Sequence, residues 1–325
     1  MREAAFIHRN KDKWQRLESA LEGLDHISAD EASDLYIQLT DDLSYARTFY
    51  PDSKITEHLN GLAVRLHHHI YRNKRTPRGR IISFWTREVP LAMAKARPHL
   101  LTAFIVFFIA MCIGALSARH DETFVRLVLG DGYVDMTLDN IRRGEPMAVY
   151  GGMDQNFMFM GITINNIRVA LFAFAAGILA YFGTAYVLFF NGIMVGAFQY
   201  FFHQHGVLRE SLLTIWVHGT LEISAIVVAG CAGFMLGHGY LFPGTYTRGE
   251  SFRRNARISL KVVMGLVPIF ITAGFLESFV TRHALTMHPL VAVMIIGISL
   301  LFVIHYFIIL PFHAERRANA PPGVS

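Results

Sequence analysis

Four apolar runs after residue 99 are long enough to cross a lipid bilayer, which takes about 20 residues in a helix. Their sequences are LLTAFIVFFIAMCIGALSA, LLTIWVHGTLEISAIVVAGCAGFML, ISLKVVMGLVPIFITAGFLESFV and PLVAVMIIGISLLFVIHYFIIL. The composition agrees, because 53% of the residues are apolar and 17% are charged, which is too apolar for an ordinary soluble domain. We therefore predict an all-α fold, a polytopic membrane helical bundle.

The first 98 residues form a second, more polar part of the chain. Their apolar residues recur at helical spacing in three stripes, and Pro51 with Asp52 supplies a break before the last stripe. The stripes are Trp14, Leu17, Leu21 and Leu24; Leu35, Leu39, Leu43 and Ala46; and Ile55, Leu59, Leu62, Leu66 and Ile70. We predict a cytoplasmic helical head of three amphipathic helices at 1–98, a transmembrane bundle at 99–313 and a cytoplasmic tail at 314–325.

The number of crossings depends on residues 168–202, which are too long for one comfortable crossing and short for two. Basic residues collect on the cytoplasmic side of a membrane. Three basic groups flank the apolar runs: those from Arg72 to Arg97, the arginines of the loop at 238–258, and Arg316 with Arg317. These groups share one side only if 168–202 forms a hairpin. We therefore predict six crossings in a multi-pass protein of the cell (inner) membrane, with both termini cytoplasmic.

Asn191 and Gly192 are the predicted turn of that hairpin, since both residue types tolerate the left-handed backbone of a tight reversal. A re-entrant pair of half-helices is the alternative for the same residues, and the sequence leaves it open. Residues 117–165, between the first and second spans, are predicted to form an extracytoplasmic helical segment that includes a stretch apolar enough to lie in the membrane interface.

Two ionisable residues, His218 and Glu222, lie one helical turn apart in an otherwise apolar span. A charged carboxylate near the bilayer centre costs on the order of 3 kcal/mol. Glu222 is therefore predicted to face the bundle interior and to be either protonated or tightly paired. Its expected partner is His218 or a polar group of another span, with Asn191 the first choice. A second carboxylate, Glu277, lies near the outer end of the fifth span.

The predicted intramembrane polar site consists of His218, Glu222, Asn191 and Glu277, to which Lys261 and His305 add further polar groups. One interpretation is a polar seam that carries protons, ions or a small solute. The other is a hydrogen-bonded clasp between helices. The sequence does not choose between them for Glu222.

Other polar residues carry weaker signals. Asn165 and Asn166 are interpreted as a cap at the start of the second span. The three histidines at 67–69 point in different directions around a helix and do not form one site unaided. Cys112 and Cys231 lie in apolar segments, where cysteine acts as a small hydrophobe. No metal site and no cofactor are predicted.

Small residues predict where helices pack closely, because they let backbones approach each other. These residues are Gly192, Gly196, Gly219, Ala225, Ala229, Gly233 and Gly237, and the last four repeat at four-residue spacing. The expected role of such ridges is tight helix association with no ligand. Because one short bundle does not need so many, they also predict a homo-oligomer, most simply a two-fold dimer.

Several segments carry a resemblance to a known family. NNIRVALFAFAAGILAYFGTAYVLFFNGIMVGA, HGTLEISAIVVAGCAGFMLG and TAGFLESFVT resemble the stage II sporulation protein M family of integral membrane proteins. WQRLESAL and LYIQLTDDLSYARTFYP in the head also look similar to that family. Its most specific element is an asparagine-glycine pair followed by an HGxxE pattern, carried here by Asn191, Gly192, His218, Gly219 and Glu222.

The resemblance implies a scaffold. Sporulation members of the family are thought to recruit and anchor peptidoglycan-degrading enzymes, and this chain resembles a broader relative, because it has a long basic head and an extended external segment. We expect a non-enzymatic scaffold whose partners are membrane lipids and other envelope proteins, with no nucleic acid. The alternative is a transporter or channel whose polar pathway runs past His218 and Glu222. A wet cavity reaching Glu222 would favour transport, whereas a dry, fully paired carboxylate would favour the scaffold.

Overall fold

The computed structural model describes residues 2–22, 29–72, 79–150, 154–283 and 286–318. Every regular element in these ranges is a helix, which confirms the predicted all-α class. The chain forms two compact units, Met1–Arg80 and Ile81–Ser325. The division falls at Arg80, so residues 81–98, which the sequence analysis assigned to the head, pack with the bundle.

The head consists of three helices, α1 (Glu3–Glu22), α2 (Ala29–Phe49) and α3 (Lys54–Arg72). Their apolar stripes meet in one core, which includes Leu39 and Leu59 with no exposed surface. Trp14 joins α1 to α2, because its Nε1 donates a hydrogen bond to Asp42 Oδ2 at 2.9 Å. The predicted break at Pro51 lies between α2 and α3 as expected. The side chains of three predicted stripe residues, Leu21, Leu24 and Ile70, lie outside the part of the chain that the structure describes.

The bundle begins with α4 (Arg80–Ser83), the wide π-turn η2 (Phe84–Glu88) and the long helix α5 (Val89–His120). Two short helices follow at one end of the bundle, α6 (Glu122–Leu129) and α7 (Asp131–Arg142), and then the single turn η3 (Ala148–Tyr150). Asp121 caps α6, because its side chain accepts a hydrogen bond from the Thr123 backbone N–H at 2.9 Å. This segment corresponds to the predicted extracytoplasmic helices at 117–165.

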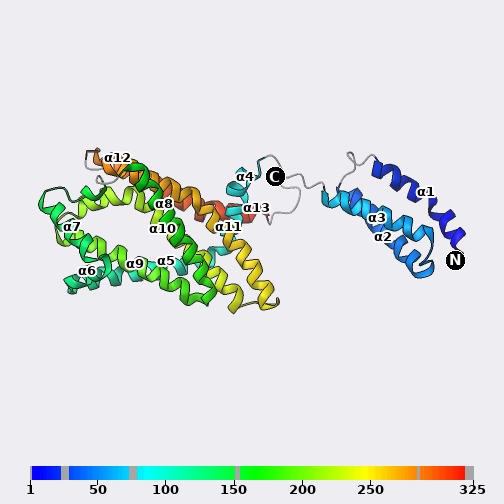
Figure 1. Cartoon of the computed structure of the whole chain (residues 1–325), viewed down its shortest axis with the longest axis horizontal. Coiled ribbons are helices and arrows are strands. Elements are labelled where there is room, and N and C mark those ends of the chain that lie inside the picture. Colours follow the sequence, from blue (N-terminus) through cyan, green and yellow to red (C-terminus); the bar gives the residue numbers. More distant parts are fainter. Residues whose placement is uncertain (1, 23–28, 73–78, 151–153, 284–285, 319–325) are drawn as a thin grey trace. The chain divides into compact units, whose positions relative to one another are not determined.

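The remaining elements complete the bundle (Figure 1). They are α8 (Gln155–Ala175), η4 (Ala176–Leu179), α9 (Ala180–Gln204), α10 (Leu208–Leu241), α11 (Arg248–Phe275), η5 (Leu276–Val280), η6 (Thr281–His283), α12 (Pro289–Ile304), η7 (His305–Ile309) and α13 (Leu310–Ala318). Five helical stretches of the described chain are long and apolar enough to cross a membrane: 80–120, 155–204, 208–241, 248–283 and 289–317. The 50-residue stretch is interrupted by the irregular segment η4.

Residues 155–204 form a hairpin, but its turn is not at Asn191 and Gly192 as predicted. The chain reverses at 176–180, where Ala180 adopts a left-handed backbone with φ of 57°. Thr184 Oγ1 then donates a hydrogen bond back to the Ala173 carbonyl oxygen at 2.9 Å, which ties α9 to α8. Asn191 stays helical, and its side chain donates to the Val187 carbonyl oxygen at 2.8 Å. The predicted turn position is therefore wrong, because Asn191 and Gly192 lie in the middle of α9.

Contacts at the two ends of α9 show that it runs the length of the bundle. At its start, the Tyr181 hydroxyl lies 3.0 Å from His238 Nδ1, near the end of α10. At its end, Gln204 Nε2 donates to Glu122 Oε1 at 2.9 Å, just beyond the end of α5. Helices α8 and α9 have 21 and 25 residues, so each is at least about 30 Å long and can span a bilayer by itself. The bundle thus makes six passes within its described residues.

Within the bundle unit, the described basic residues at 87–97, those that follow α10, and Arg316 with Arg317 gather at one end. The rings of His99 at the start of α5 and His238 at the end of α10 are 4.9 Å apart, which places the loop after α10 beside the start of α5. Arg97 lies 3.9 Å from Glu315 in α13, which brings the C-terminal helix to the same end. Assignment of that end to the cytoplasm remains a prediction from loop charge.

Cysteine labelling tests this orientation. We expect a cysteine at exposed Gly249 to react with a membrane-impermeant maleimide only after the cells are permeabilised, because the loop is predicted to be cytoplasmic. The matched control is Gly132→Cys in α7, at the opposite end, which should react in intact cells. The background is Cys112→Ala, and Cys231 is fully buried. The reverse labelling pattern would contradict the predicted orientation.

Helix α10 is the central helix of the bundle. Of its most apolar 18-residue window, 83% is buried, against 11% for the last apolar stretch. Exposed apolar side chains instead cover the outer helices, such as Phe104 on α5 and Leu301 on α12, as expected for surfaces that face lipid. Most residues of α10 therefore lie inside the bundle, whichever face of the helix they are on.

Most of the predicted small residues pack helices of the same chain against each other. A β-carbon at Gly192 would lie 2.6 Å from the Phe107 carbonyl oxygen, and one at Gly196 would overlap that of Met111, so both glycines bring α9 against α5. Gly233 and Gly237 likewise meet η4 and α9, and Ala225 and Ala229 are buried. The ridges are thus used within one chain and no longer argue for a dimer, which stays a prediction.

Candidate functional site

The imidazole of His218 is held by two residues that follow α11. Its Nδ1 lies 3.0 Å from Thr281 Oγ1, and its Nε2 lies 3.8 Å from Glu277 Oε2. The side chains of His218 and Glu277 are 5% and 13% exposed, so the pair is almost closed off from the surface. His218 lies inside the bundle because it belongs to α10, the central helix. Glu277, expected near the outer end of its span, joins it there.

The wide turn at the end of α11 brings both partners of His218 into place. Residues 276–280 form the π-turn η5, and a short 3-10 turn follows at 281–283. Such wide turns rotate the residues that follow them and occur often at functional sites. Here Glu277 and Thr281 both point at α10. The segment TAGFLESFVT, which carries part of the family resemblance, therefore includes both residues that contact the His218 imidazole.

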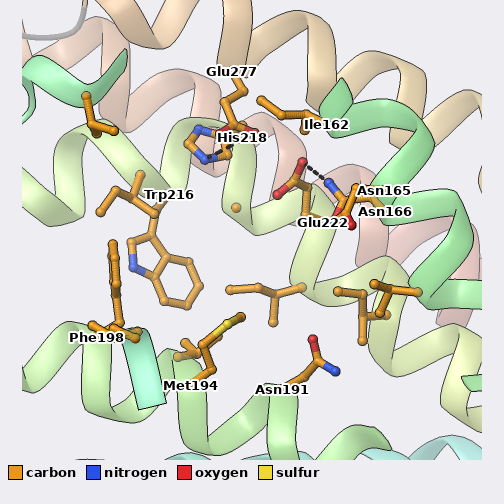
Figure 2. A pocket seen from close by; sticks show the side chains of 18 of the residues that line it. Ile162, Asn165, Asn166, Asn191, Met194, Phe198, Trp216, His218, Glu222 and Glu277 are labelled. Carbon is orange, nitrogen blue, oxygen red and sulfur yellow. Dashed lines mark hydrogen bonds and ion pairs between the residues drawn. The ribbon is translucent and has the colours of Figure 1, made fainter. Parts of the chain in front are cut away.

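Glu222 is paired with Asn166 of α8. Asn166 Nδ2 donates a hydrogen bond to Glu222 Oε1 at 2.5 Å (Figure 2). Asn191, the predicted partner, lies on the opposite wall of the same pocket and bonds its own helix instead. The prediction of Asn191 as the partner is therefore wrong, although its placement near the site is correct.

The interpretation of Asn166 as a helix cap is also wrong. Helix α8 begins at Gln155, nearly three turns before the asparagines, and Asp154 caps it by accepting hydrogen bonds from the backbone N–H groups of Asn156 and Phe157. The apolar stretch that the sequence analysis placed in the interface is therefore the first half of the span. Asn166 lies in its middle and supplies a polar side chain at membrane depth.

His218, Glu222 and Glu277 form one cluster. One side-chain nitrogen or oxygen from each lies within 4.8 Å of the others, so the three groups can bind a single small ion. The sequence predicted these three residues as part of one polar site but predicted no metal site. Their close approach could not be predicted, because Glu277 is far from the other two in sequence and reaches them only through the packing of α11 on α10. Lys261 and His305 are not part of it: Lys261 Nζ pairs with Glu88 Oε2 at 2.7 Å, and His305 is exposed.

A cavity of about 730 Å³ lies against the cluster. Its walls come mainly from α8, α9 and α10, with Val128, Leu129 and Tyr133 of α6 and α7 at one end. Figure 2 shows the polar cluster along one wall, with Asn191, Met194 and Phe198 facing it across the open space. Gly219 lines the cavity, and a β-carbon there would meet only side chains of its own helix at 3.7 Å or more, so this glycine does not pack helices as predicted.

Polar groups other than the cluster also line the cavity. Trp216 Nε1 and Gln199 Oε1 are buried and have no hydrogen-bond partner among the described residues. Burial raises the pKa of the Tyr133 phenol, in α7 outside the spans, to about 12, so this hydroxyl stays protonated at neutral pH. Tyr133 and the amide side chains of Asn165 and Asn191 line the cavity, so donors and acceptors other than the cluster occur in its wall. The aromatic and aliphatic residues between them make up the rest of the wall.

These features define a polytopic α-helical membrane protein with an acidic and imidazole cluster beside a cavity inside its bundle. Residues 103–282, more than half of the chain, match the family described as Stage II sporulation protein M, and the chain belongs to that family. The matched range includes every residue of the cluster. The head does not share this match: residues 4–72 match a separate Domain of unknown function (DUF8413). No curated protein and no solved structure matches the chain.

Proposed function

We propose that this protein is a non-enzymatic transport protein that moves a small cation across the membrane. The observation that carries the proposal is the cavity of about 730 Å³ that reaches His218, Glu222 and Glu277. Ionisable residues inside a membrane bundle are costly, and they commonly mark ion or proton pathways. A structural clasp alone would be served equally well by a closed bundle.

The charge of the cavity favours a cation. Two carboxyl groups reach its wall, whereas the described residues that line it include no lysine or arginine. An anion would meet these acidic groups with no positive charge to compensate them, so it would be excluded. A cation would be attracted and would lose its hydration shell to carboxylate, amide and imidazole groups. The acidic lining thus favours a solute with a positive charge.

Amide side chains in the cavity wall support a polar guest. Asn165, Asn166 and Asn191 line the cavity beside the carboxyl and imidazole groups of the cluster. Buried polar groups are almost always hydrogen-bonded, by protein or by ordered water. We therefore expect these side chains to supply hydrogen-bond donors and acceptors to a hydrated cation.

Filling the cavity tests the proposal. We expect Gly219→Leu to fold normally but to lose at least about 10-fold in cation flux, because the new side chain occupies the cavity without displacing another helix. Flux is measured in proteoliposomes with dyes for protons and for divalent cations. The matched control is Gly297→Leu on α12, where nothing lies within 4 Å of an added β-carbon. No flux by the wild-type protein, or equal flux by both variants, would argue against transport.

A scaffold is the second candidate, because the head is a separate compact unit with its own core. A unit of this kind, with a family match different from that of the bundle, suits a docking role for another envelope protein. Co-purification tests it. Partners captured by the full chain from native membranes, and lost when residues 1–72 are removed, would support the scaffold. Mass measurement in lipid discs would decide the predicted dimer in the same preparation.

A further inference from the structure

We propose that His218 Nε2 and one carboxylate oxygen each of Glu222 and Glu277 together bind one divalent transition-metal ion of the first row, such as Zn²⁺. This assignment deepens the proposed function, because it names the cation, and it rests on that function for the route by which the ion enters. It uses the cluster and the cavity wall together. Support for the site comes in four parts.

The first part is distance. Nitrogen and oxygen ligands lie about 2.0–2.2 Å from zinc, which puts neighbouring ligands of a tetrahedron about 3.4 Å apart. His218 Nε2 and Glu277 Oε2 are 3.8 Å apart, and all three ligand atoms lie within 4.8 Å of one another. Side-chain rotations of the two glutamates that shorten the longest of these separations by up to about 1.4 Å would close the set around an ion.

The second part is the way the ligands are held. A histidine that binds metal usually uses its other ring nitrogen in a hydrogen bond, which fixes its tautomer and orientation, and ligating carboxylates are hydrogen-bonded in turn. Here His218 Nδ1 faces Thr281 Oγ1 at 3.0 Å, which directs Nε2 at the carboxylates. Asn166 Nδ2 donates to Glu222 Oε1 at 2.5 Å. Both ligands thus have the outer partner that a metal site needs.

The third part is charge. Two ionised carboxylates buried within 4.8 Å of each other repel strongly, and each also loses hydration. A divalent cation between them, with a neutral imidazole, brings the net charge of the site to zero. It thereby relieves both the repulsion and part of the desolvation penalty. A shared proton is the competing way to reduce the same repulsion, and the experiment below separates the two.

The fourth part is ligand chemistry. Calcium and magnesium prefer sites built only of oxygen, whereas imidazole suits zinc and its first-row neighbours. Three protein ligands also leave one position of a tetrahedral site open. Because His218, Glu222 and Glu277 all line the cavity, that position can face it and take water. An open position is what exchange of a transported ion requires.

Direct measurement of bound metal tests the site in the full chain in lipid discs. The protein is stripped with a chelator, titrated with Zn²⁺ or Mg²⁺ alone, and assayed by elemental mass spectrometry. We expect one tightly bound Zn²⁺ per wild-type chain and no stoichiometric Mg²⁺. His218→Ala and Glu277→Gln should weaken Zn²⁺ binding at least about 100-fold. The matched control is His305→Ala, because His305 lies in a span and outside the cluster.

Thr281 is a positioning residue, and its variants test the orientation of the imidazole. Thr281→Val removes the hydroxyl group at His218 Nδ1 with little change in shape, so we expect Zn²⁺ affinity to fall about 10- to 100-fold without loss of stoichiometry. Thr281→Ser should restore it. A purely structural role of the hydroxyl would lower the stability of Thr281→Val and leave the Zn²⁺ affinity of the folded variant unchanged.

Wild-type protein alone also decides the matter if the cluster variants do not fold. X-ray absorption at the zinc edge should show only nitrogen and oxygen ligands, with the scattering of an imidazole. Absence of stoichiometric Zn²⁺, which would mean a shared proton only, overturns the proposal, as does full binding by His218→Ala. Bound Zn²⁺ without flux keeps the site and refutes transport, whereas proton flux without bound Zn²⁺ keeps transport and refutes the site.

Discussion

Replacing Gly196 by alanine is expected to destabilise the bundle by at least about 2 kcal/mol, although a single methyl group is added. The new β-carbon would overlap the Met111 carbonyl oxygen, a backbone atom of α5 that cannot turn away. Helices α5 and α9 must therefore separate, and overpacking of this kind in a dense interior commonly costs about 1–3 kcal/mol or more. Thermal unfolding in one detergent, followed by size-exclusion chromatography, measures the loss.

Gly297→Ala is the matched control for Gly196→Ala. Gly297 lies in α12, and nothing lies within 4 Å of an added β-carbon. Alanine favours helix over glycine by up to about 1 kcal/mol, so this variant should be as stable as the wild type or slightly more stable. The two substitutions are chemically identical and should have opposite signs. Equal melting temperatures for both would show that the close approach of α5 and α9 does not hold the bundle together.

Glu222→Gln is expected to leave the protein folded and to lose most of its cation flux, by about 10-fold or more. Glutamine keeps an oxygen that accepts the hydrogen bond from Asn166, so the contact between α8 and α10 persists. It cannot carry negative charge, so the cavity loses one of its two carboxylates. The measurement pairs the melting temperature with flux in proteoliposomes. A folded, inactive protein is the result expected of a pathway.

Glu222→Ala gives the complementary result. It leaves the Asn166 amide without its acceptor inside the bundle, which costs about 1–3 kcal/mol. Asn166→Leu should remove much of that cost in the alanine background, because the orphaned donor is then absent, and the double-mutant cycle isolates the pair. If Glu222→Gln keeps both fold and flux while Glu222→Ala unfolds, the carboxylate is structural and the transport proposal loses its main support.

Hydropathy and loop charge were enough to predict most of the architecture. The length of each apolar run identified the spans, because a helix needs a minimum number of consecutive apolar residues to cross a bilayer. The arginines around 238–258 predicted that residues 168–202 fold back on themselves, and the structure confirms the hairpin through the contacts of Tyr181 and Gln204 at its two ends. The same local reasoning predicted that His218 and Glu222 share a face, since four residues make about one helical turn.

The partners in the candidate site could not be predicted in this way. Spacing places residues on a face of one helix, but it does not say which face of which neighbour meets it. Asn166 and Asn191 are both asparagines in apolar segments, and only the packing of α8 against α10 decides that Asn166 reaches Glu222. Thr281 and Glu277 reach His218 because a wide turn ends α11, and no residue pattern announced that turn.

The position of the hairpin turn was likewise decided by tertiary contacts. Asn191 and Gly192 have the local propensity for a reversal, but Gly192 is needed where α9 crosses α5, since a β-carbon there would lie 2.6 Å from the Phe107 carbonyl oxygen. The chain instead turns at 176–180, where Gly177 lies directly against Gly233 and Ala180 accepts a left-handed backbone. The sequence predicts how many helices can cross the membrane, because the thickness of the lipid bilayer sets the length of apolar helix required. Close packing between helices decides where the chain turns and which polar groups meet.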